Sequence, residues 1–426
     1  MSGQKVAKKP AKKAAKKAVK RKSPRQKLAT AIDRGEAVSS MEPMLIGSDS
    51  RYRSELNDKV LKLTQQGSAF RSRLPEGLAE PLSSLVREMN CYYSNLIEGH
   101  NTHPIDIQRA LFGEHSDDPE SRDLQQEALA HISVQRWIDE GGIDGSATKV
   151  SVVHDIHRRF CELLPDSLRW VTNPDTGLRK EVIPGEVRKD EVKVGDHWPI
   201  SPGAVKRYME RWEAVYAPLG TFDTALNVAA AHHRLLWIHP FLDGNGRVAR
   251  LISYASLRAV LDTAGLWSVA RGLARNTDRY KSLLCAADLP RRNDLDGRGN
   301  LSEEALVAFT HFFLDICIDQ IDFMEGLMQP KELRNRIMVW LDDEIRTKRQ
   351  HERSKAIIDH VLFNGQILRR DLAAVTRLAD RTARRIAQQL ATTGILRAST
   401  SREPYRLAFP AELAPRLTPG LYPGSN

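Results

Sequence analysis

The sequence has few of the features that would direct a protein to a membrane or an oxidising compartment. Its 426 residues include no run of about 18 apolar residues, the length that a membrane-spanning helix needs. The N-terminus is charged but lacks an apolar segment, so it does not have the pattern of a secretory signal. Only four cysteines are present, far apart, without a Cys-x-x-Cys pair or metal-ligand spacing. We therefore expect buried free thiols in a cytoplasmic protein.

Acidic residues are absent from the first 30 positions, which carry twelve lysines and arginines. The whole chain has a net charge of +10, and subtracting these twelve charges leaves −2 for residues 31–426. A Lys/Ala/Pro tract with so much like charge cannot bury a core, so residues 1–30 are predicted to be a disordered tail. Such a tail is compatible with non-specific nucleic-acid binding and, equally, with a purely solubilising role.

Residues His239–Arg250, with the sequence HPFLDGNGRVAR, combine a histidine, a carboxylate, a glycine-rich turn and two arginines. The apolar periodicity around this segment predicts helices over 224–238 and 247–261, so the turn Asp243–Gly246 lies at a helix N-terminus. The N–H groups there are unpaired and partially positive, which predicts an anion site. Each piece alone is more often ordinary turn or surface chemistry. Their occurrence together in one loop favours phosphate binding.

The defined positions of this segment resemble the full signature of Fic-domain proteins, most of which transfer AMP from ATP to a protein hydroxyl: His239-x-Phe241-x-Asp243-Gly244-Asn245-Gly246-Arg247-x-x-Arg250. The resemblance implies that His239 deprotonates a Ser, Thr or Tyr hydroxyl of the target and that Phe241 is structural. It also implies that Asp243 holds Mg²⁺ on the α- and β-phosphates. A histidine suits the role of base because its ordinary pKa lies near neutrality.

The resemblance further implies how the nucleotide is held. Gly244, Asn245 and Gly246 would form the anion hole, Arg247 would contact the β-phosphate region, and Arg250 would contact the γ-phosphate. Nucleotidyl transfer depends chiefly on positioning and charge neutralisation, which such a group of residues supplies. Some relatives carry lysine in place of the second glycine and transfer a phosphate instead, whereas Gly246 keeps the adenylyl-transfer pattern.

A second motif, SNLIEG, lies upstream at Ser94–Gly99, where a predicted helix ends at a glycine. Ser94 and Glu98 are four residues apart and face the same side of that helix. By itself the segment is typical of an amphipathic helix with an exposed glutamate. Beside the first motif it resembles the inhibitory pattern of Fic proteins, (Ser/Thr)-x-x-x-Glu-(Gly/Asn). That resemblance implies that Glu98 pairs with Arg250 and displaces the γ-phosphate.

Two more segments belong to the expected site. Within 181–202, Val192-Lys193-Val194 before Gly195 are predicted as a short strand and a turn. They resemble the Fic flap, which binds the target segment by strand pairing; an isolated surface hairpin is the alternative. Farther on, residues 276–280 resemble the region that contributes to the adenine pocket. Tyr280 either stacks on the base or packs inside a helical core.

The pattern changes after Pro330, where a charged helical linker precedes a basic C-terminal segment. Helices are predicted over 354–362, 368–374 and 380–390, the last with Asp380 as its N-cap, followed by a two-stranded wing within 394–407. This order resembles a winged helix-turn-helix, which would bring Arg381, Arg384 and Arg385 to DNA. Residues 351–410 carry eleven basic and five acidic side chains, in agreement with a phosphate-facing surface. Winged helices also serve as protein-contact modules, so both readings stay open.

We therefore expect a mainly α protein with a Fic-type helical core and a β-hairpin flap. The predicted parts are a disordered tail, an N-terminal helical region with the inhibitory helix, the Fic core, a helical linker, a winged-helix domain and a C-terminal tail: 1–30, 31–105, 106–330, 331–350, 351–410 and 411–426. The expected activity is adenylyl transfer from ATP, with Mg²⁺, to a protein hydroxyl. A DNA-binding regulator on a Fic scaffold and an enzyme that removes AMP are the alternatives. Homo-oligomerisation stays open, and no membrane partner is expected.

Overall fold

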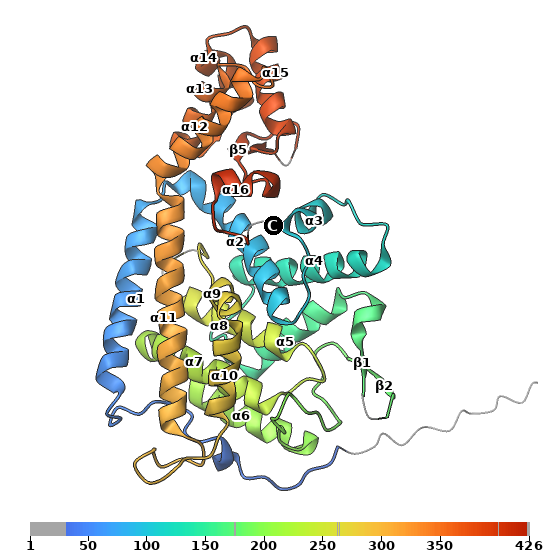
Figure 1. The fold of residues 1–426 in the computed structure, drawn as a ribbon, viewed down its shortest axis with the longest axis vertical. Helices are drawn as coiled ribbons and strands as arrows, with labels where there is room; N and C mark the ends of the chain where they lie inside the picture. The colour runs from blue at the N-terminus through green and yellow to red at the C-terminus, as the bar shows by residue number, and fades with distance from the viewer. Residues whose placement is uncertain (1–30, 174–175, 262, 264, 399, 424–426) are drawn as a thin grey trace, which may run out of the picture. The chain divides into compact units, whose positions relative to one another are not determined.

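The structure is a computed structural model that describes residues 31–173, 176–261, 263, 265–398 and 400–423 (Figure 1). The predicted tail at 1–30 lies outside the described residues. Within them the fold is mainly helical, as predicted. The α-helices are α1 (Arg53–Arg73), α2 (Glu76–Ile97), α3 (Pro104–Leu111), α4 (Pro119–Asp139), α5 (Val150–Glu162), α6 (Val205–Tyr216), α7 (Thr221–Ile238), α8 (Asn245–Val260), α9 (Val269–Arg275), α10 (Thr277–Ala287), α11 (Glu303–Met328), α12 (Pro330–Arg346), α13 (Ser354–Asn364), α14 (Leu372–Thr376), α15 (Asp380–Thr392) and α16 (Ala414–Leu417).

Short elements join these helices. The strands are β1 (Trp170–Thr172), β2 (Arg179–Glu181), β3 (Gln366–Ile367), β4 (Leu396–Arg397) and β5 (Tyr405–Leu407). The 3₁₀ turns are η1 (Val38–Met41), η2 (Asp166–Arg169), η3 (Pro202–Ala204), η4 (Arg369–Asp371) and η5 (Ala411–Leu413). No helix in the described part of the chain is both long and apolar enough to cross a membrane.

The centre of the fold is the helix pair α7 and α8, joined by residues 239–244. The helices predicted on either side of the motif are confirmed, with bounds that differ by three residues or fewer. Helix α7 is buried on nearly every side because it packs against α1, α6, α8 and α11 at once. Figure 1 shows α11 lying beside α1 and α7, so the connection between α7 and α8 is supported from several directions.

The strands of the first half do not lie where the sequence predicted. β1 and β2 form an antiparallel hairpin in which Val171 faces Lys180. Val192 and Lys193 are not in a strand, and the only ladder contact near them is a single bridge between Val194 and His197. The strand predicted there is wrong. The antiparallel partner of Val192 in that register would be Pro199, which has no N–H to donate.

The C-terminal elements run in the order α13, β3, α14, α15, β4, β5. Their sheet has the strand order β3-β5-β4, with Ile367 opposite Tyr405 and Leu396 opposite Leu407. The three predicted helices are present, whereas β3 was not predicted. Asp380 is not the N-cap of α15 but its first helical residue, where an acidic side chain still favours the helix dipole. The winged-helix assignment and the domain limits stay predictions.

Candidate active site

The loop after α7 begins with a strained residue. His239 has φ 51° and ψ 64°, a left-handed conformation that is uncommon for a residue with a side chain. Arg188, which is buried, holds this backbone: its Nε lies 2.7 Å from the His239 carbonyl oxygen, and its Nη2 lies 2.5 Å from that of Ile200. Such a conformation persists where surrounding contacts fix it. Arg188 could not be singled out from the sequence, since its partners are backbone carbonyls.

The turn before α8 is closed by the side chain of Asn245. Its Oδ1 accepts a hydrogen bond from the Phe241 N–H at 2.9 Å, and its Nδ2 donates to the Phe241 carbonyl at 2.9 Å. Gly244 has φ +80°, which glycine adopts without strain. Because both ends of the Asn245 amide are hydrogen-bonded to Phe241, this side chain holds the turn in place before α8.

A buried histidine lies under the same turn. His157 of α5 accepts a hydrogen bond at Nδ1 from the Gly185 N–H, at 2.9 Å, so its Nε2 carries the proton and donates to the Asp243 carbonyl, at 3.2 Å. Its ring stacks on that of Phe241, with the centroids 3.7 Å apart. Burial lowers the pKa of His157 to about 4, so the ring stays neutral. One imidazole thus connects the loop at Gly185 to the turn at Asp243.

Arg247 is held by a carboxylate that the sequence analysis missed. Its guanidinium forms an ion pair with Glu127 of α4, whose side chain is 1% exposed. Glu127 also lies 2.6 Å from Nδ1 of His100, and the Arg247 guanidinium covers the ring of Phe160. Burial lowers the pKa of Arg247 to about 10, so it remains a cation at neutral pH. A glutamate on an amphipathic helix gave no hint of this role.

Arg250 connects the motif helix with the end of α2. Its Nε donates to Ser94 Oγ at 2.9 Å and its Nη2 to the Ser94 carbonyl at 3.0 Å. The same Nη2 lies 2.5 Å from Glu98 Oε1. A Cβ built on Gly246 would lie only 2.2 Å from that oxygen, so the Glu98 carboxylate covers the first turn of α8. The predicted anion site therefore faces a carboxylate of the chain itself.

The charges in this region shift several pKa values. Burial raises the pKa of Glu98, but Arg250 and Arg247 outweigh it and hold the pKa below its ordinary value. Burial also lowers the pKa of His239 to about 4, with Arg188 and His197 acting in the same direction. His239 is therefore neutral at physiological pH, as a base must be before it accepts a proton.

Asp243 is the motif residue that could contact a cation. Its side chain is 51% exposed. The part of the carboxyl that is buried still raises its pKa, and the negative charge of Glu98 raises that pKa further. Among the described residues no group of three or more His, Cys, Asp or Glu side chains is arranged to hold a metal. Mg²⁺ commonly uses one or two carboxylates together with nucleotide phosphates and water. The donor set fits a cation shared with phosphates, but not one held by protein alone.

The residues predicted for the target-binding flap and for the adenine pocket lie in different surroundings. Val194 and Trp198 are exposed, Lys193 Nζ lies 5.4 Å from the centroid of the Trp198 ring, and His197 anchors the segment through Nε2 to the Trp237 carbonyl, at 2.9 Å. Tyr280 is only 2% exposed, and its Oη lies 2.7 Å from Nε2 of His232. The ring of Tyr280 packs in the helical core, which was the alternative to stacking on the adenine base.

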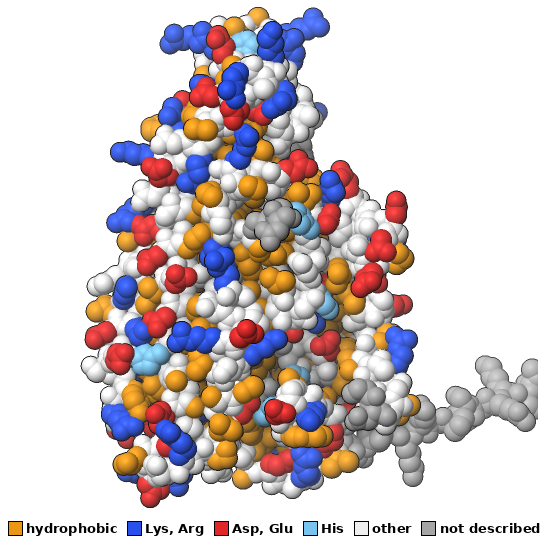
Figure 2. Space-filling model, viewed as in Figure 1, with side chains coloured by type: hydrophobic (Ala, Val, Ile, Leu, Met, Phe, Trp, Pro, Cys, Tyr) orange, Lys and Arg blue, Asp and Glu red, His pale blue; other side chains and the backbone are white. Residues whose placement is uncertain are grey.

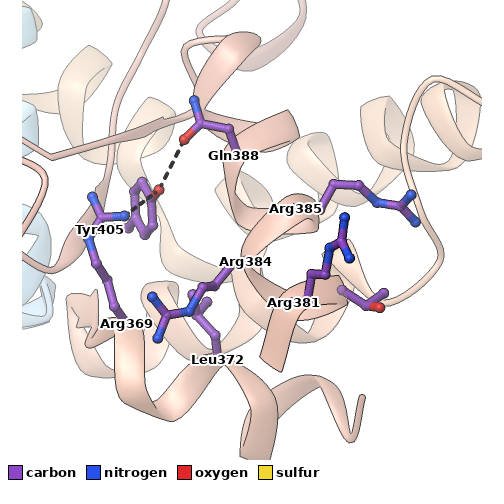
Figure 3. Close-up of a pocket in the computed structure, with 8 residues that line it drawn as sticks. Arg369, Leu372, Arg381, Arg384, Arg385, Gln388 and Tyr405 are labelled. Carbon is purple, nitrogen blue, oxygen red and sulfur yellow. Dashed lines mark hydrogen bonds between the residues drawn. The ribbon is translucent and has the colours of Figure 1, made fainter. Parts of the chain in front are cut away.

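The three arginines predicted at DNA line one cavity in the C-terminal elements (Figure 3). Its volume is about 530 Å³, and its lining is Arg369, Leu372, Arg381, Thr382, Arg384, Arg385, Gln388 and Tyr405. Arg384 Nε lies 2.8 Å from Asp380 Oδ2, whereas Arg381 and Arg385 have no ion pair with any carboxylate of the described residues. Figure 2 shows basic side chains gathered at the top of the view, where Figure 1 places α14 and α15.

Comparison with known proteins locates a recognised domain around the motif. Residues 148–257 match the model of the Fic/DOC family. The chain is 28% identical over 163 residues to the protein adenylyltransferase Fic of Drosophila erecta and to that of Drosophila melanogaster. These matches cover 38% of this chain and 30% of each relative, so the chain spans less than a third of the curated relatives' length.

Solved structures of Fic proteins resemble the fold. A Fic family protein from Desulfovibrio desulfuricans G20 is 16% identical with a TM-score of 0.49, over 85% of this chain and 98% of that one. Fic-1 of C. elegans is 17% identical with a TM-score of 0.47, over 65% and 74% of the two chains. Residues 148–257, the part of the chain that matches the Fic/DOC family model, include the motif from His239 to Arg250.

Proposed function

We propose that the protein transfers AMP from ATP to a hydroxyl group of a target protein. The target oxygen attacks the α-phosphorus, the bond from that phosphorus to the bridging oxygen of pyrophosphate breaks, and His239 takes the hydroxyl proton. The observation that carries this proposal is the position of His239 and Arg250 on either side of a glycine-rich helix N-terminus. The adenylyltransferases that are similar to this chain over 163 residues support it.

In this reaction the residues of the motif act chiefly by charge and position. The first N–H groups of α8 and the buried guanidinium of Arg247 face the phosphates, and fixed dipoles of this kind stabilise charge that develops in a transition state. Asp243 is the residue that would hold Mg²⁺, which neutralises phosphate charge when bound. His157, Glu127 and Arg188 do not take part in the reaction themselves. They fix the backbone and the guanidinium that do.

We further propose that the enzyme is inhibited by its own Glu98. This carboxylate pairs with Arg250 and lies over Gly246, where it competes with the γ-phosphate for the Arg250 guanidinium. Two unit charges about 4 Å apart attract by about 4 kcal/mol at an effective dielectric constant near 20, and desolvation offsets part of that. A net preference of a few kcal/mol leaves an active state populated at the per-cent level.

Labelling with radioactive ATP and Mg²⁺ tests both proposals. We expect weak labelling of the wild type, strong labelling of the Glu98→Gly variant, and none when His239→Ala is added to it. Equal labelling with and without His239 would exclude the proposed base. Release of AMP from a labelled protein by the wild type, but not by Glu98→Gly, would instead favour hydrolytic removal of AMP, in which water attacks the phosphorus and the protein hydroxyl leaves.

A second function is supported by the arginine cavity: we propose that the C-terminal elements bind duplex DNA. Arg381 and Arg385 are exposed on one face of α15 without a carboxylate partner among the described residues. Arg369 is held beside them, with Nη1 2.8 Å from Tyr405 Oη and the guanidinium over the Tyr405 ring. Guanidinium groups fixed in this way suit phosphodiester contacts, and a winged helix places its third helix in the major groove.

The test is a gel shift with the full chain at several salt concentrations. The Arg381→Glu/Arg385→Glu variant should weaken binding and flatten the dependence of log K on log salt by about 0.9 per lost phosphate contact. Lys206→Glu/Arg346→Glu is the control, because it makes the same charge change at exposed positions away from the cavity. Equal losses in the two variants would mean that charge alone attracts DNA and that the cavity is not the site.

A further inference from the structure

The helix that ends at Glu98 contacts the C-terminal elements along its whole length. On one side α2 packs against α4 and α9, and on another against α13 and β5. Residues 409–422, near the end of the described chain, also reach α2 and the neighbouring α3. Glu98 thus lies at the end of a helix that packs against α4 and α9 and also against the C-terminal elements (Figure 1).

The first contact is between two backbones near the start of α2. A Cβ built on Gly77 would lie 1.9 Å from the Cα of Gly365, and one built on Gly365 would lie 2.2 Å from the Cα of Gly77. Gly365 also has φ +77° because it ends α13 in a left-handed conformation. Only glycine fits at either position, so the start of α2 is held directly against the end of α13.

The second contact is made in the middle of α2 through Gln108 of α3. Its Nε2 donates to Glu88 Oε2 at 3.2 Å and to the Phe409 carbonyl at 3.3 Å. Its Oε1 accepts a hydrogen bond from the Ala411 N–H at 2.7 Å. Glu88 is buried in α2, so one amide side chain links the centre of the helix to residues 409–411.

The third contact lies one turn before the glutamate. Tyr93 donates from Oη to the Leu421 carbonyl at 2.8 Å, and the rings of Tyr92 and Tyr422 meet edge to face with centroids 5.6 Å apart. Tyr93 directly precedes Ser94, whose hydroxyl and carbonyl oxygens both accept from Arg250. A shift of residues 420–422 would therefore be passed to the residues that hold Arg250.

We infer that the C-terminal elements, from α13 to Tyr422, clamp α2 in its inhibitory position, and that loosening this clamp activates the enzyme. The inference rests on the proposed adenylyl transfer and its inhibition by Glu98. For ATP to reach Arg250, Glu98 must leave the first turn of α8, and a shift of the last turn of α2 would carry it away. The contacts at Tyr92 and Tyr93 oppose that movement, so a partner that binds the C-terminal elements has a direct route to the switch.

Self-labelling of the full chain with radioactive ATP tests the clamp. Tyr422→Ala removes the ring contact and should raise labelling by about 5- to 30-fold, within the usual range of coupling between two sites and no more than loss of the Glu98–Arg250 pair would give. Tyr93→Phe removes only the hydroxyl and should give a smaller rise in the same direction. Tyr216→Phe is its matched control, because it loses one buried hydrogen bond to the Met44 carbonyl away from α2, and it should label like the wild type.

The Glu98→Gly background separates the clamp from the underlying activity. Since the switch is already absent there, adding Tyr422→Ala should change labelling little. Equal enhancement with and without Glu98 would overturn the clamp, and so would wild-type labelling in both Tyr422→Ala and Tyr93→Phe while Glu98→Gly is active. If Glu98→Gly itself is not labelled, the proposed function fails instead. Should Tyr422→Ala not fold, Tyr93→Phe against Tyr216→Phe decides the question.

Discussion

Replacing Glu98 by glutamine or by glycine separates the charge of the inhibitory side chain from its bulk. In the structure the carboxylate has two effects. It pairs with Arg250 across 2.5 Å, and its oxygen occupies space directly above Gly246. Glutamine removes the charge but keeps a side chain of the same size in that space. Glycine removes both.

The size of the effect follows from how the pair is placed. Truncating one partner of a fully buried ion pair costs about 3–5 kcal/mol, and an exposed pair contributes about 0–1 kcal/mol. Arg250 is buried but the Glu98 side chain is 32% exposed, so we expect a value between these, about 1–2 kcal/mol. That corresponds to a rise of about 5- to 30-fold in the ATP-competent population. Arg250 keeps its two bonds to Ser94 and stays ordered.

The assay is initial-rate labelling over a range of ATP concentrations. Glu98→Gln should be intermediate, with a lowered apparent KM for ATP, and Glu98→Gly should be fastest because the space above Gly246 is also free. Thermal unfolding of each variant checks that the fold is retained. Labelling by Glu98→Gly no faster than by the wild type would refute the reasoning. Glutamine as active as glycine would show that bulk contributes nothing.

Three further predictions concern groups that support the site. Burial raises the pKa of Glu88 from 4.5 to about 7, so the folded state binds this proton more tightly than the unfolded one; the contribution of Glu88 to stability is full below about pH 4.5 and is lost as pH rises through about 7, by at most about 3 kcal/mol. Glu88→Gln should abolish that slope in denaturant titrations; an unchanged slope would assign it to another group. In His157→Gln the side-chain amide can still donate to the Asp243 carbonyl, and in His157→Asn it can still accept from the Gly185 N–H. We expect His157→Gln to keep more of kcat and His157→Asn to keep more of the affinity for the target, measured as KM; identical profiles would mean that the ring only fills space. Chelation of Mg²⁺ and Asp243→Ala should each abolish labelling, and full activity in EDTA would remove the metal from the mechanism.

The parts of the molecule that the sequence predicted well are those set by local pattern. The helices on both sides of the motif follow from apolar periodicity, and Gly99 ends α2 with φ +91° as its position suggested. The resemblance of SNLIEG and the motif to Fic signatures led to the pairing of Glu98 with Arg250, and the two side chains do lie in contact. Whether that contact inhibits an enzyme is for the labelling experiment to decide.

What the sequence could not supply depends on contacts between distant segments. Glu127, His157 and Arg188 each act through a partner at least 28 residues away in the chain, and nothing in their own segments distinguishes them from ordinary helix or loop residues. The strand predicted at 192–194 is wrong because the facing residue is Pro199. The contact between Gly77 and Gly365 was likewise invisible, since a glycine in a helix and one at a helix end have many local explanations.

The guanidinium of Arg188 has a consequence for how target choice could evolve or be redesigned. Because one planar group binds carbonyls of residues 200, 238 and 239, the predicted target-binding segment and the backbone of the proposed base form one rigid piece. Exchanging only the exposed residues 193–196 and 198 with those of another protein would retain that tether and the geometry of the base. Exchanging a longer stretch without Arg188 would free the base from its scaffold, however well the new surface fitted its target.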